Sequence, residues 1–278
     1  MPELPEIETF RRHVAPLTIG RRIEGAWASD TRILKNRSPK EMRMLEGSTI
    51  TEVGRRGKAL TFGHDSGIRT VVRFGMTGQM YVCPPDTPRE KHLHIALSLS
   101  DGNELRYIDP RRFGAVWVFE KDEKDTLSGL DRMGPEPDDP SLTWRYLRDT
   151  LSGRSIPVKE ALMDQTVVAG LGNIWSEEAL FRARVCPLDP CSAITIPMWK
   201  RIAEEIPRTV EYAIESDAVT DEEYLEGKGR NRFDMGCLSV YGKAGEPCPV
   251  CGCPIVRSVI AGRGAHWCPR CQRARATL

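Results

Sequence analysis

The chain has 278 residues, of which 40% are apolar and 28% charged, and its formal net charge is +1. This is the composition of a globular protein long enough for two domains, and no apolar run approaches the roughly 20 residues of a membrane helix. The N-terminus also lacks the basic and apolar regions of a signal peptide, so we expect a cytoplasmic protein rather than a membrane or secreted one.

The N-terminal residues Met-Pro-Glu-Leu-Pro-Glu begin a predicted helix, because apolar residues then recur at intervals of three and four. These apolar positions are Leu4, Ile7, Phe10 and Val14. Pro and Glu are ordinary in a first helical turn. A second interpretation gives them chemistry. Removal of Met1 would expose the secondary amine of Pro2, whose pKa of roughly 7.7–8.0 leaves part of it uncharged at neutral pH. This amine could attack a sugar C1′ to form an iminium ion, with Glu3 and Glu6 as acid–base partners.

Residues 22–120 have the pattern of β structure. Short β-rich runs are separated by clusters of Gly, Pro, Asp and Asn. The expected strands are Arg22–Trp27, Thr49–Val53, Ala59–Phe62, Arg69–Phe74, His92–Leu99, Leu105–Ile108 and Ala115–Phe119. No helical pattern separates them, so the sequence predicts a sandwich or flattened barrel rather than a parallel sheet.

Residues 121–139 have the composition of a linker. Helical patterns follow it. They cover Trp144–Thr150, Val158–Val168, Ile174–Arg184 and Trp199–Ser216. Pro207 is expected to kink or divide the last helix.

Four of the nine cysteines form two CxxC pairs that are 16 residues apart. They are Cys248, Cys251, Cys268 and Cys271. Two such pairs close a tetrahedral zinc site, and four thiolates leave no position open for water, so we expect one structural Zn²⁺. The residues between the pairs, 252–267, can form a β-hairpin. The other cysteines share no spacing and are expected to be packing or surface thiols.

Two turns are candidates for phosphate binding. Arg263, between two glycines, would project from the hairpin tip with a fork of donors, although a plain polar turn has the same sequence. The glycine-containing stretch 169–173 suits a helix–two-turn–helix, in which the helix that starts at Asn173 presents free N–H groups to phosphate. An ordinary helix cap is the alternative. The segment from Lys228 to the last residue contains nine Lys and Arg residues and two acidic residues. This excess of positive charge favours a phosphate-binding face over a plain solvated surface.

Two further turns carry basic residues. Lys58 lies in the basic turn Gly54–Lys58, which alone would be a solvated hairpin. The stretch Asp109-Pro-Arg-Arg-Phe-Gly114 places Phe113 next to two arginines. An exposed Phe beside Arg is how proteins wedge into a base stack, and a Phe that folds inward is the alternative.

Together these motifs resemble the formamidopyrimidine-DNA glycosylase (8-oxoguanine DNA glycosylase) family. The matching motifs follow the order of the family over nearly the whole chain. They are Met1–Thr9, Gly57-Lys58, Gly75–Gly78, Lys91-His92, Asp109–Gly114, Gly134–Pro137, Gly170–Asn173, Val240–Gly242 and the CxxC hairpin. The resemblance implies an α+β multidomain fold: a catalytic β-sandwich domain with an N-terminal helix (1–130), a linker (131–145), a helix–two-turn–helix DNA-binding domain (146–235) and a zinc-binding β-hairpin (236–278).

The resemblance also implies residue roles. Pro2 would form the Schiff base, Glu3 would protonate the sugar ring oxygen and Glu6 would position Pro2. Lys58 would contact a phosphate near the lesion. The other implied DNA contacts are Met76, Arg111 and Phe113, which fill the gap left by the flipped nucleotide, Asn173 and Arg263, which grip the flanking phosphates, and His92, Arg112 and Lys159.

We therefore expect a bifunctional DNA glycosylase and β,δ-lyase of base-excision repair. It would excise oxidised purines, such as 8-oxoguanine and formamidopyrimidines, from damaged double-stranded DNA. We expect a monomer associated with the bacterial nucleoid. Two departures from the family concern base preference: Leu93 replaces an Asp that is frequent there, and the lesion-covering loop 226–235 is shorter and more basic. Two alternatives remain open: an endonuclease VIII-like glycosylase for oxidised pyrimidines, and a zinc-stabilised damaged-DNA-binding protein without turnover.

Overall fold

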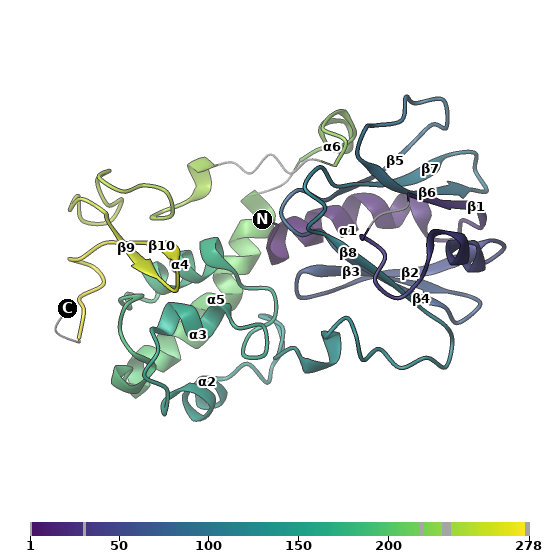
Figure 1. The fold of residues 1–278 in the computed structure, drawn as a ribbon. Helices are drawn as coiled ribbons and strands as arrows, with labels where there is room; N and C mark the ends of the chain where they lie inside the picture. Colours follow the sequence, from purple (N-terminus) through teal and green to yellow (C-terminus); the bar gives the residue numbers. More distant parts are fainter. Residues whose placement is uncertain (1, 30–31, 217–218, 230–234, 276–278) are drawn as a thin grey trace. The chain divides into compact units, whose positions relative to one another are not determined.

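The computed structural model, drawn in Figure 1, describes residues 2–29, 32–216, 219–229 and 235–275. Contacts divide the chain into two compact units. The first is Met1–Asp131 with Asp217–Phe233, and the second is Arg132–Ser216 with Asp234–Leu278. Among the described helices, none has both the length and the apolar character needed to cross a membrane.

The first unit contains a sandwich of two four-stranded antiparallel sheets, in the orders β1-β6-β7-β5 and β2-β3-β4-β8. The strands are β1 (Ile23–Ala28), β2 (Ile50–Arg56), β3 (Ala59–His64), β4 (Arg69–Arg73), β5 (Gln79–Cys83), β6 (Leu93–Leu99), β7 (Glu104–Ile108) and β8 (Ala115–Phe119). The predicted sandwich is confirmed, and each of the seven predicted runs overlaps a strand.

Strand β5 is the strand of this sandwich that the sequence did not predict. All five of its residues are buried, so polar and apolar side chains do not alternate along it. The helices α1 (Leu4–Thr18) and α6 (Asp221–Glu226) both pack against β5, which explains why it has no solvent-facing side. β7 and β8 are also buried throughout and were predicted, so the absence of a period-2 pattern does not by itself explain why β5 was missed.

Helix α1 is buried more completely than its apolar pattern predicted. The four predicted apolar residues are at most 1% exposed, and Phe10 packs on Phe74 with ring centroids 4.6 Å apart. Glu6 and Glu8 are also buried. The reason is that α1 contacts β2 and β3 of one sheet and β5 of the other, so little of its circumference is left for solvent.

Helix α6 packs with the first unit, whereas the predicted boundaries assigned residues 146–235 to the helical domain. Tyr224 is 4% exposed within the sandwich core and its hydroxyl donates a hydrogen bond to the carbonyl oxygen of Met80 at 2.6 Å. Its ring stacks on His13 at 4.2 Å between centroids, and His13 Nδ1 lies 2.5 Å from Asp221 Oδ1. The predicted helical domain, 146–235, therefore extends too far. The segment Asp217–Phe233 belongs to the first unit, where the buried side chain of Tyr224 anchors it.

The second unit combines helices with a small hairpin. Its helices are α2 (Trp144–Leu151), α3 (Val158–Met163), α4 (Asn173–Arg182) and α5 (Ile196–Ser216), and its strands are β9 (Val256–Ile260) and β10 (Arg263–Trp267). Short 3₁₀ helices occur at Pro39–Leu45, Leu130–Arg132, Cys191–Ala193 and Met235–Cys237 in the chain as a whole. α5 runs through Pro207 without being divided. The predicted zinc hairpin is present, and β10 packs on α4.

Helix α3 ends five residues before the predicted boundary, because a side chain closes the following turn. The Gln165 amide accepts a hydrogen bond from the Gly170 N–H at 2.9 Å and donates one to the Leu171 carbonyl at 2.7 Å. Gly170 has a φ of +88°, which favours glycine. Two turns therefore separate α3 from α4, as the predicted helix–two-turn–helix requires.

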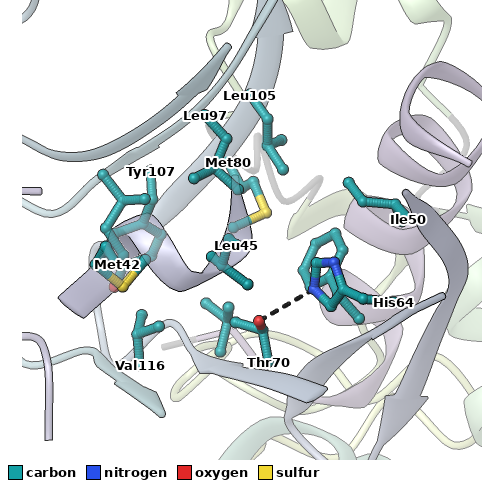
Figure 2. Close-up of a pocket in the computed structure, with 13 residues that line it drawn as sticks. Met42, Leu45, Ile50, His64, Thr70, Met80, Leu97, Leu105, Tyr107 and Val116 are labelled. Carbon is teal, nitrogen blue, oxygen red and sulfur yellow. Dashed lines mark hydrogen bonds between the residues drawn. The ribbon is translucent and has the colours of Figure 1, made fainter. Parts of the chain in front are cut away.

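A cavity of about 30 Å³ lies between the two sheets of the sandwich. Figure 2 shows that its walls are almost entirely apolar, with His64 and Thr70 as the polar pair. His64 is 6% exposed, and its two ring nitrogens lie 3.3 Å from the hydroxyl oxygens of Thr70 and Ser48. The cavity is too small and apolar for a substrate, so we treat it as a packing feature.

Burial lowers the pKa of His64 to about 4, whereas the unfolded value is about 6.5. The unfolded chain therefore binds a proton that the folded chain excludes, and stability falls as the pH drops from about 6.5 towards 4. We expect this one group to remove about 2 kcal/mol of unfolding free energy between pH 7.5 and pH 5. Urea unfolding of wild type and His64→Phe at both pH values measures the effect, and equal pH dependence in the two proteins would contradict it.

Candidate functional site

The first turn of α1 holds three of the predicted catalytic residues. Pro2 is half-buried, while Glu3 and Glu6 are 2% and 3% exposed. The backbone N–H of Glu3 donates a hydrogen bond to Glu6 Oε2 at 2.7 Å. This capping bond fixes the Glu6 carboxylate beside the peptide that joins residues 2 and 3. Met1 lies outside the described residues.

Lys58 lies in the short turn between β2 and β3, where Arg56 pairs with Ala59. Gly57 allows this turn through a φ of +52°. One end of the hairpin is tied to the first helix by an ion pair between Arg55 Nε and Glu8 Oε2 at 3.4 Å. The structure therefore brings the basic turn to α1, although its sequence position lies some fifty residues downstream.

Glu8 is a residue that the sequence analysis missed. Burial raises its pKa, but the hydrogen bonds from Arg11 and Arg12 and the charge of Arg55 outweigh burial and leave the pKa below its ordinary value. Glu8 therefore stays ionised against the helix. Its position four residues after Leu4, on the predicted buried face, was the signal that could have identified it.

The three predicted gap-filling side chains come from two neighbouring turns. Met76 is 44% exposed and Phe113 is 57% exposed, so the alternative in which Phe113 folds inward is wrong. The guanidinium carbon of Arg111 lies 4.6 Å from the centre of the Phe113 ring. Arg112 is also exposed and has a φ of +55°, a conformation that costs free energy in a non-glycine residue.

Asp109 holds these two turns together. Its side chain is completely buried. One carboxylate oxygen accepts hydrogen bonds from the Thr77 hydroxyl at 2.5 Å and from the Arg111 N–H at 3.2 Å, and the other accepts from the Gly114 N–H at 2.7 Å. A single buried carboxylate thus positions the turn of Met76 and the turn of Phe113 relative to each other.

Two glycines allow this close approach. A Cβ at Gly75 would lie 2.5 Å from the carbonyl carbon of Phe113, and Gly75 has a φ of +60°. A Cβ at Gly114 would lie 1.8 Å from the Tyr107 hydroxyl oxygen. The backbones of the two turns are therefore in direct contact, and no larger residue fits at either position without a shift of the backbone.

His92 borders a hollow of about 380 Å³ in the first unit. Lys91, Gln79 and Lys228 also line it. Lys228 forms an ion pair with Glu90, with Nζ 3.0 Å from Oε1, and so attaches the start of the 226–235 loop to this hollow. Residues 230–234 of that loop lie outside the described residues. His92 was expected from the family resemblance, whereas no motif in the sequence pointed to Gln79 and Glu90.

Asn173 is the first residue of α4 and follows the N-cap residue Gly172. Its side-chain oxygen is buried and has no hydrogen-bond partner among the residues that the structure describes. The N-terminus of a helix presents unsatisfied N–H groups and partial positive charge. This end of α4 is therefore suited to a phosphate group, and the contact between Asn173 and a DNA phosphate stays a prediction.

Arg263 is exposed at the start of β10, next to the hairpin tip. Lys159 is not exposed at all, which contradicts its predicted role as a direct DNA contact. Its ammonium group donates to the Glu177 carboxylate and, at 2.6 Å, to the carbonyl oxygen of Gly264. The reason is that α3 packs on α4, where the buried Glu177 supplies the counter-charge that a buried ammonium needs. Lys159 is thus a positioning residue for the backbone beside Arg263.

Two neighbouring carboxylates of α4 hold the zinc region. Glu177 accepts hydrogen bonds from the backbone N–H and ring Nδ1 of His266, both at 3.0 Å. Burial raises the pKa of Glu177, and the charge of Lys159 opposes this shift. Glu178 accepts three backbone N–H groups, from residues 239–241, each at 2.9 Å. Neither carboxylate was predicted, because a helix pattern alone does not distinguish a buried Glu from a solvated one.

The four predicted metal ligands come together. The Sγ atoms of Cys248, Cys251, Cys268 and Cys271 all lie within 4.8 Å of one another. Four thiolates in this arrangement suit the tetrahedral coordination of one structural zinc ion.

Comparisons with known proteins cover nearly the whole chain. Three families match in order: the N-terminal domain of formamidopyrimidine-DNA glycosylase at residues 1–116, the H2TH domain of the same enzyme at 133–223, and a zinc finger found in FPG and IleRS at 245–274. The formamidopyrimidine-DNA glycosylase of Symbiobacterium thermophilum is 41% identical over 98% of this chain and 89% of its own. That of Bacillus subtilis is 39% identical over 98% and 99%.

Solved structures agree with these relatives. The MutM (Fpg) protein of Thermus thermophilus is similar with a TM-score of 0.83 and 35% identity, over 99% of this chain and 100% of that one. A Lactococcus lactis Fpg mutant in complex with Fapy-dG containing DNA is similar with a TM-score of 0.88 and 31% identity, over 98% and 100%.

Replacement of Asp109 by Ala should destabilise the first unit. The substitution leaves the Thr77 hydroxyl and two backbone N–H groups without their acceptor, and we expect a loss of about 2–4 kcal/mol. Asp122→Ala, at an exposed position in the same unit, should change stability by less than about 0.5 kcal/mol. Urea unfolding measures both variants. An equal loss of unfolding free energy in Asp109→Ala and Asp122→Ala would show that Asp109 does not hold the turns of Met76 and Phe113 together.

Lys159→Met should destabilise the second unit by about 3–5 kcal/mol, because Glu177 is then buried without its counter-charge. The double variant Lys159→Met with Glu177→Gln should recover a large part of this loss, since no uncompensated charge remains. Arg208→Met breaks an exposed ion pair with Glu205 and serves as the control, with an expected loss below about 1 kcal/mol. Thermal unfolding of the four proteins gives the comparison, and a double variant less stable than Lys159→Met would refute the explanation.

Proposed function

This chain belongs to the formamidopyrimidine-DNA glycosylase family, and from that premise we propose that it excises oxidised purines from DNA with the amine of Pro2 as nucleophile. The enzyme is a DNA glycosylase of base-excision repair with one structural zinc. The observation that supports the proposed nucleophile most directly is the first turn of α1, where the carboxylates of Glu3 and Glu6 are buried just after residue 2 and Glu6 accepts the Glu3 N–H.

The proposed reaction follows from the atoms in that turn. The Pro2 amine attacks C1′, the bond from C1′ to the damaged base breaks, and the base leaves with a proton. Glu3 donates a proton to the ring oxygen, so that the sugar opens and an iminium ion forms between C1′ and Pro2. Loss of the C2′ proton then expels the 3′ phosphate, and a second elimination expels the 5′ phosphate. Glu6 positions the amine, and the Lys58 ammonium stabilises phosphate charge.

The wedge formed by Met76, Arg111 and Phe113 would stabilise the extruded state of the nucleotide, which this chemistry requires. C1′ of a stacked nucleotide is inaccessible, and extrusion of the nucleotide costs a few kcal/mol. An exposed Phe held against an Arg can occupy the gap in the stack and recover part of that cost. The buried Asp109 keeps the wedge rigid, so less entropy is lost when DNA binds.

The second unit would hold the backbone on either side of the lesion. The N-terminus of α4 at Asn173 and the guanidinium of Arg263 are the two phosphate ligands, and Lys159 holds the hairpin backbone in place beside Arg263. His92 and Arg112 are further contacts from the first unit. We propose that a monomer suffices, and that the protein acts in the cytoplasm on nucleoid DNA.

The preference for oxidised purines rests on the known relatives, since complexes of similar proteins contain carbocyclic 8-oxo-G and Fapy-dG DNA. A panel of duplexes that carry 8-oxoguanine, formamidopyrimidine or thymine glycol tests this preference. We expect the two purine lesions to be cleaved fastest. Faster cleavage of thymine glycol would instead assign the chain to the oxidised-pyrimidine type.

Borohydride trapping tests the nucleophile. Reduction during turnover of an 8-oxoguanine duplex should give a covalent adduct whose mass places the sugar on residue 2 of a chain without Met1. Pro2→Gly should lose most of the trapped product, and Glu3→Gln should slow base excision by about 10²–10⁴-fold. Glu24→Gln, at an exposed position of strand β1, should behave as wild type. A Pro2→Gly protein that cleaves at the wild-type rate would exclude the mechanism, and binding without any adduct would favour a non-catalytic protein.

A further inference from the structure

Five arginines surround a hollow of about 390 Å³ in the second unit, and the proposed reaction uses none of them. They are Arg184, Arg201, Arg270, Arg273 and Arg275. No acidic side chain lines this hollow, and within the described part of the chain none of the five forms an ion pair. Five like charges that face one space repel one another unless an anion joins them.

The zinc site accounts for only part of this charge. Cys251 and Cys271 also line the hollow, and a zinc ion with four thiolates carries a net charge of −2. Two arginines would neutralise that charge. Three positive charges are then left over, so the hollow retains a surplus that a structural role beside the metal does not explain.

The hollow lies at the far end of the second unit from the proposed phosphate contacts. Asn173 begins α4 and Arg184 follows its end, so about 15 Å of helix separates them. Arg263 begins β10, and the zinc knuckle of Arg270 follows the end of that strand, about 17 Å away. This step rests on the proposed function: the hollow is a separate site from the two phosphate contacts, and competition with undamaged duplex tests whether DNA reaches it.

The walls of the hollow are not purely polar. Met198 is 3% exposed at its base, and Val250 is 62% exposed, a high value for an apolar side chain. Arg201 donates Nε to the Ala183 carbonyl at 2.7 Å, which fixes its side chain while its terminal N–H groups remain available for a ligand. The site therefore offers a fork of donors for carboxylates together with a small apolar surface.

From these observations we infer that the hollow binds an acidic peptide segment of a partner protein. Carboxylates of the segment pair with the surplus arginines, and one apolar side chain packs on Val250 and Met198. A concave site of this volume suits a short peptide, whereas a DNA duplex is convex and presents no apolar group beside its phosphates.

Fluorescence anisotropy with the zinc-loaded full chain tests the inference. The probe is a labelled peptide of Asp and Glu with a central Leu-Phe pair, and the matched probe replaces each acid by its amide. We expect binding of the acidic peptide only. The double variant Arg184→Ser with Arg273→Ser should weaken it by about tenfold or more. The control Arg145→Ser with Arg208→Ser removes two exposed arginines of the same unit and should bind normally. Cleavage of the lesion duplex and zinc content should be unchanged in both.

Four outcomes would overturn the inference: equal binding of the two peptides, equal affinity of the pocket variant, displacement of the peptide by undamaged duplex, or displacement by inorganic phosphate at the same molar concentration as unlabelled peptide. The third outcome would assign the hollow to DNA and the fourth to small anions. The proposed DNA contacts are tested separately, by cleavage of the lesion duplex in the absence of peptide. If Arg263→Ser cleaved this duplex at the wild-type rate, the proposed function of Arg263 would fail while the peptide inference would be unaffected.

Discussion

The burial of α1 against both sheets of the sandwich is the constraint on which the proposed N-terminal chemistry depends. Four apolar side chains of this helix are at most 1% exposed, and each contributes about 1.5–3 kcal/mol when it is fully buried. A shift of the helix would lose several of these contributions at once. The first turn is therefore anchored to the core, and the hydrogen bond between the Glu3 N–H and Glu6 fixes the peptide that follows residue 2.

Buried polar and charged groups likewise position the exposed side chains that are proposed to contact DNA. Asp109 is buried and fixes the turns that expose Met76 and Phe113, and the buried pair of Lys159 and Glu177 fixes the backbone next to Arg263. Buried charges are expensive unless every one of them is paired or hydrogen-bonded. Such charges tolerate few alternative geometries, so they specify the position of their exposed neighbours more sharply than apolar packing alone does.

The sequence predicted those features that carry a local pattern. The first helix and the four cysteines were predicted from fixed residue spacings, and the seven strands from β-rich runs between turn residues. The exposure of Phe113 was expected from the family resemblance, since its turn alone left an inward-folded Phe as an alternative. The sequence analysis missed β5, whose residues are buried by elements far away in the chain, and it missed α6, in which Tyr224 is the one buried residue and no apolar stripe marks a helix. It placed Lys159 on the surface because the sequence does not show that Glu177 is opposite. The structural roles of Glu8, Asp109 and Glu178 were missed for the same reason. A buried carboxylate is recognised by its hydrogen-bond and ion-pair partners, and many of these partners come from distant segments.

Basic residues that are close in the sequence can belong to separate surfaces of the folded protein. The basic C-terminal segment was interpreted as one phosphate-binding face, yet β10 carries Arg263 at its start and the zinc knuckle with Arg270 follows its end. A strand extends about 3.4 Å per residue, so arginines that are only seven positions apart lie at opposite ends of the hairpin. Three-dimensional neighbours instead join Arg270 to Arg184 and Arg201, which the sequence assigned to helices. The protein thus presents two cationic surfaces, one at each end of β10.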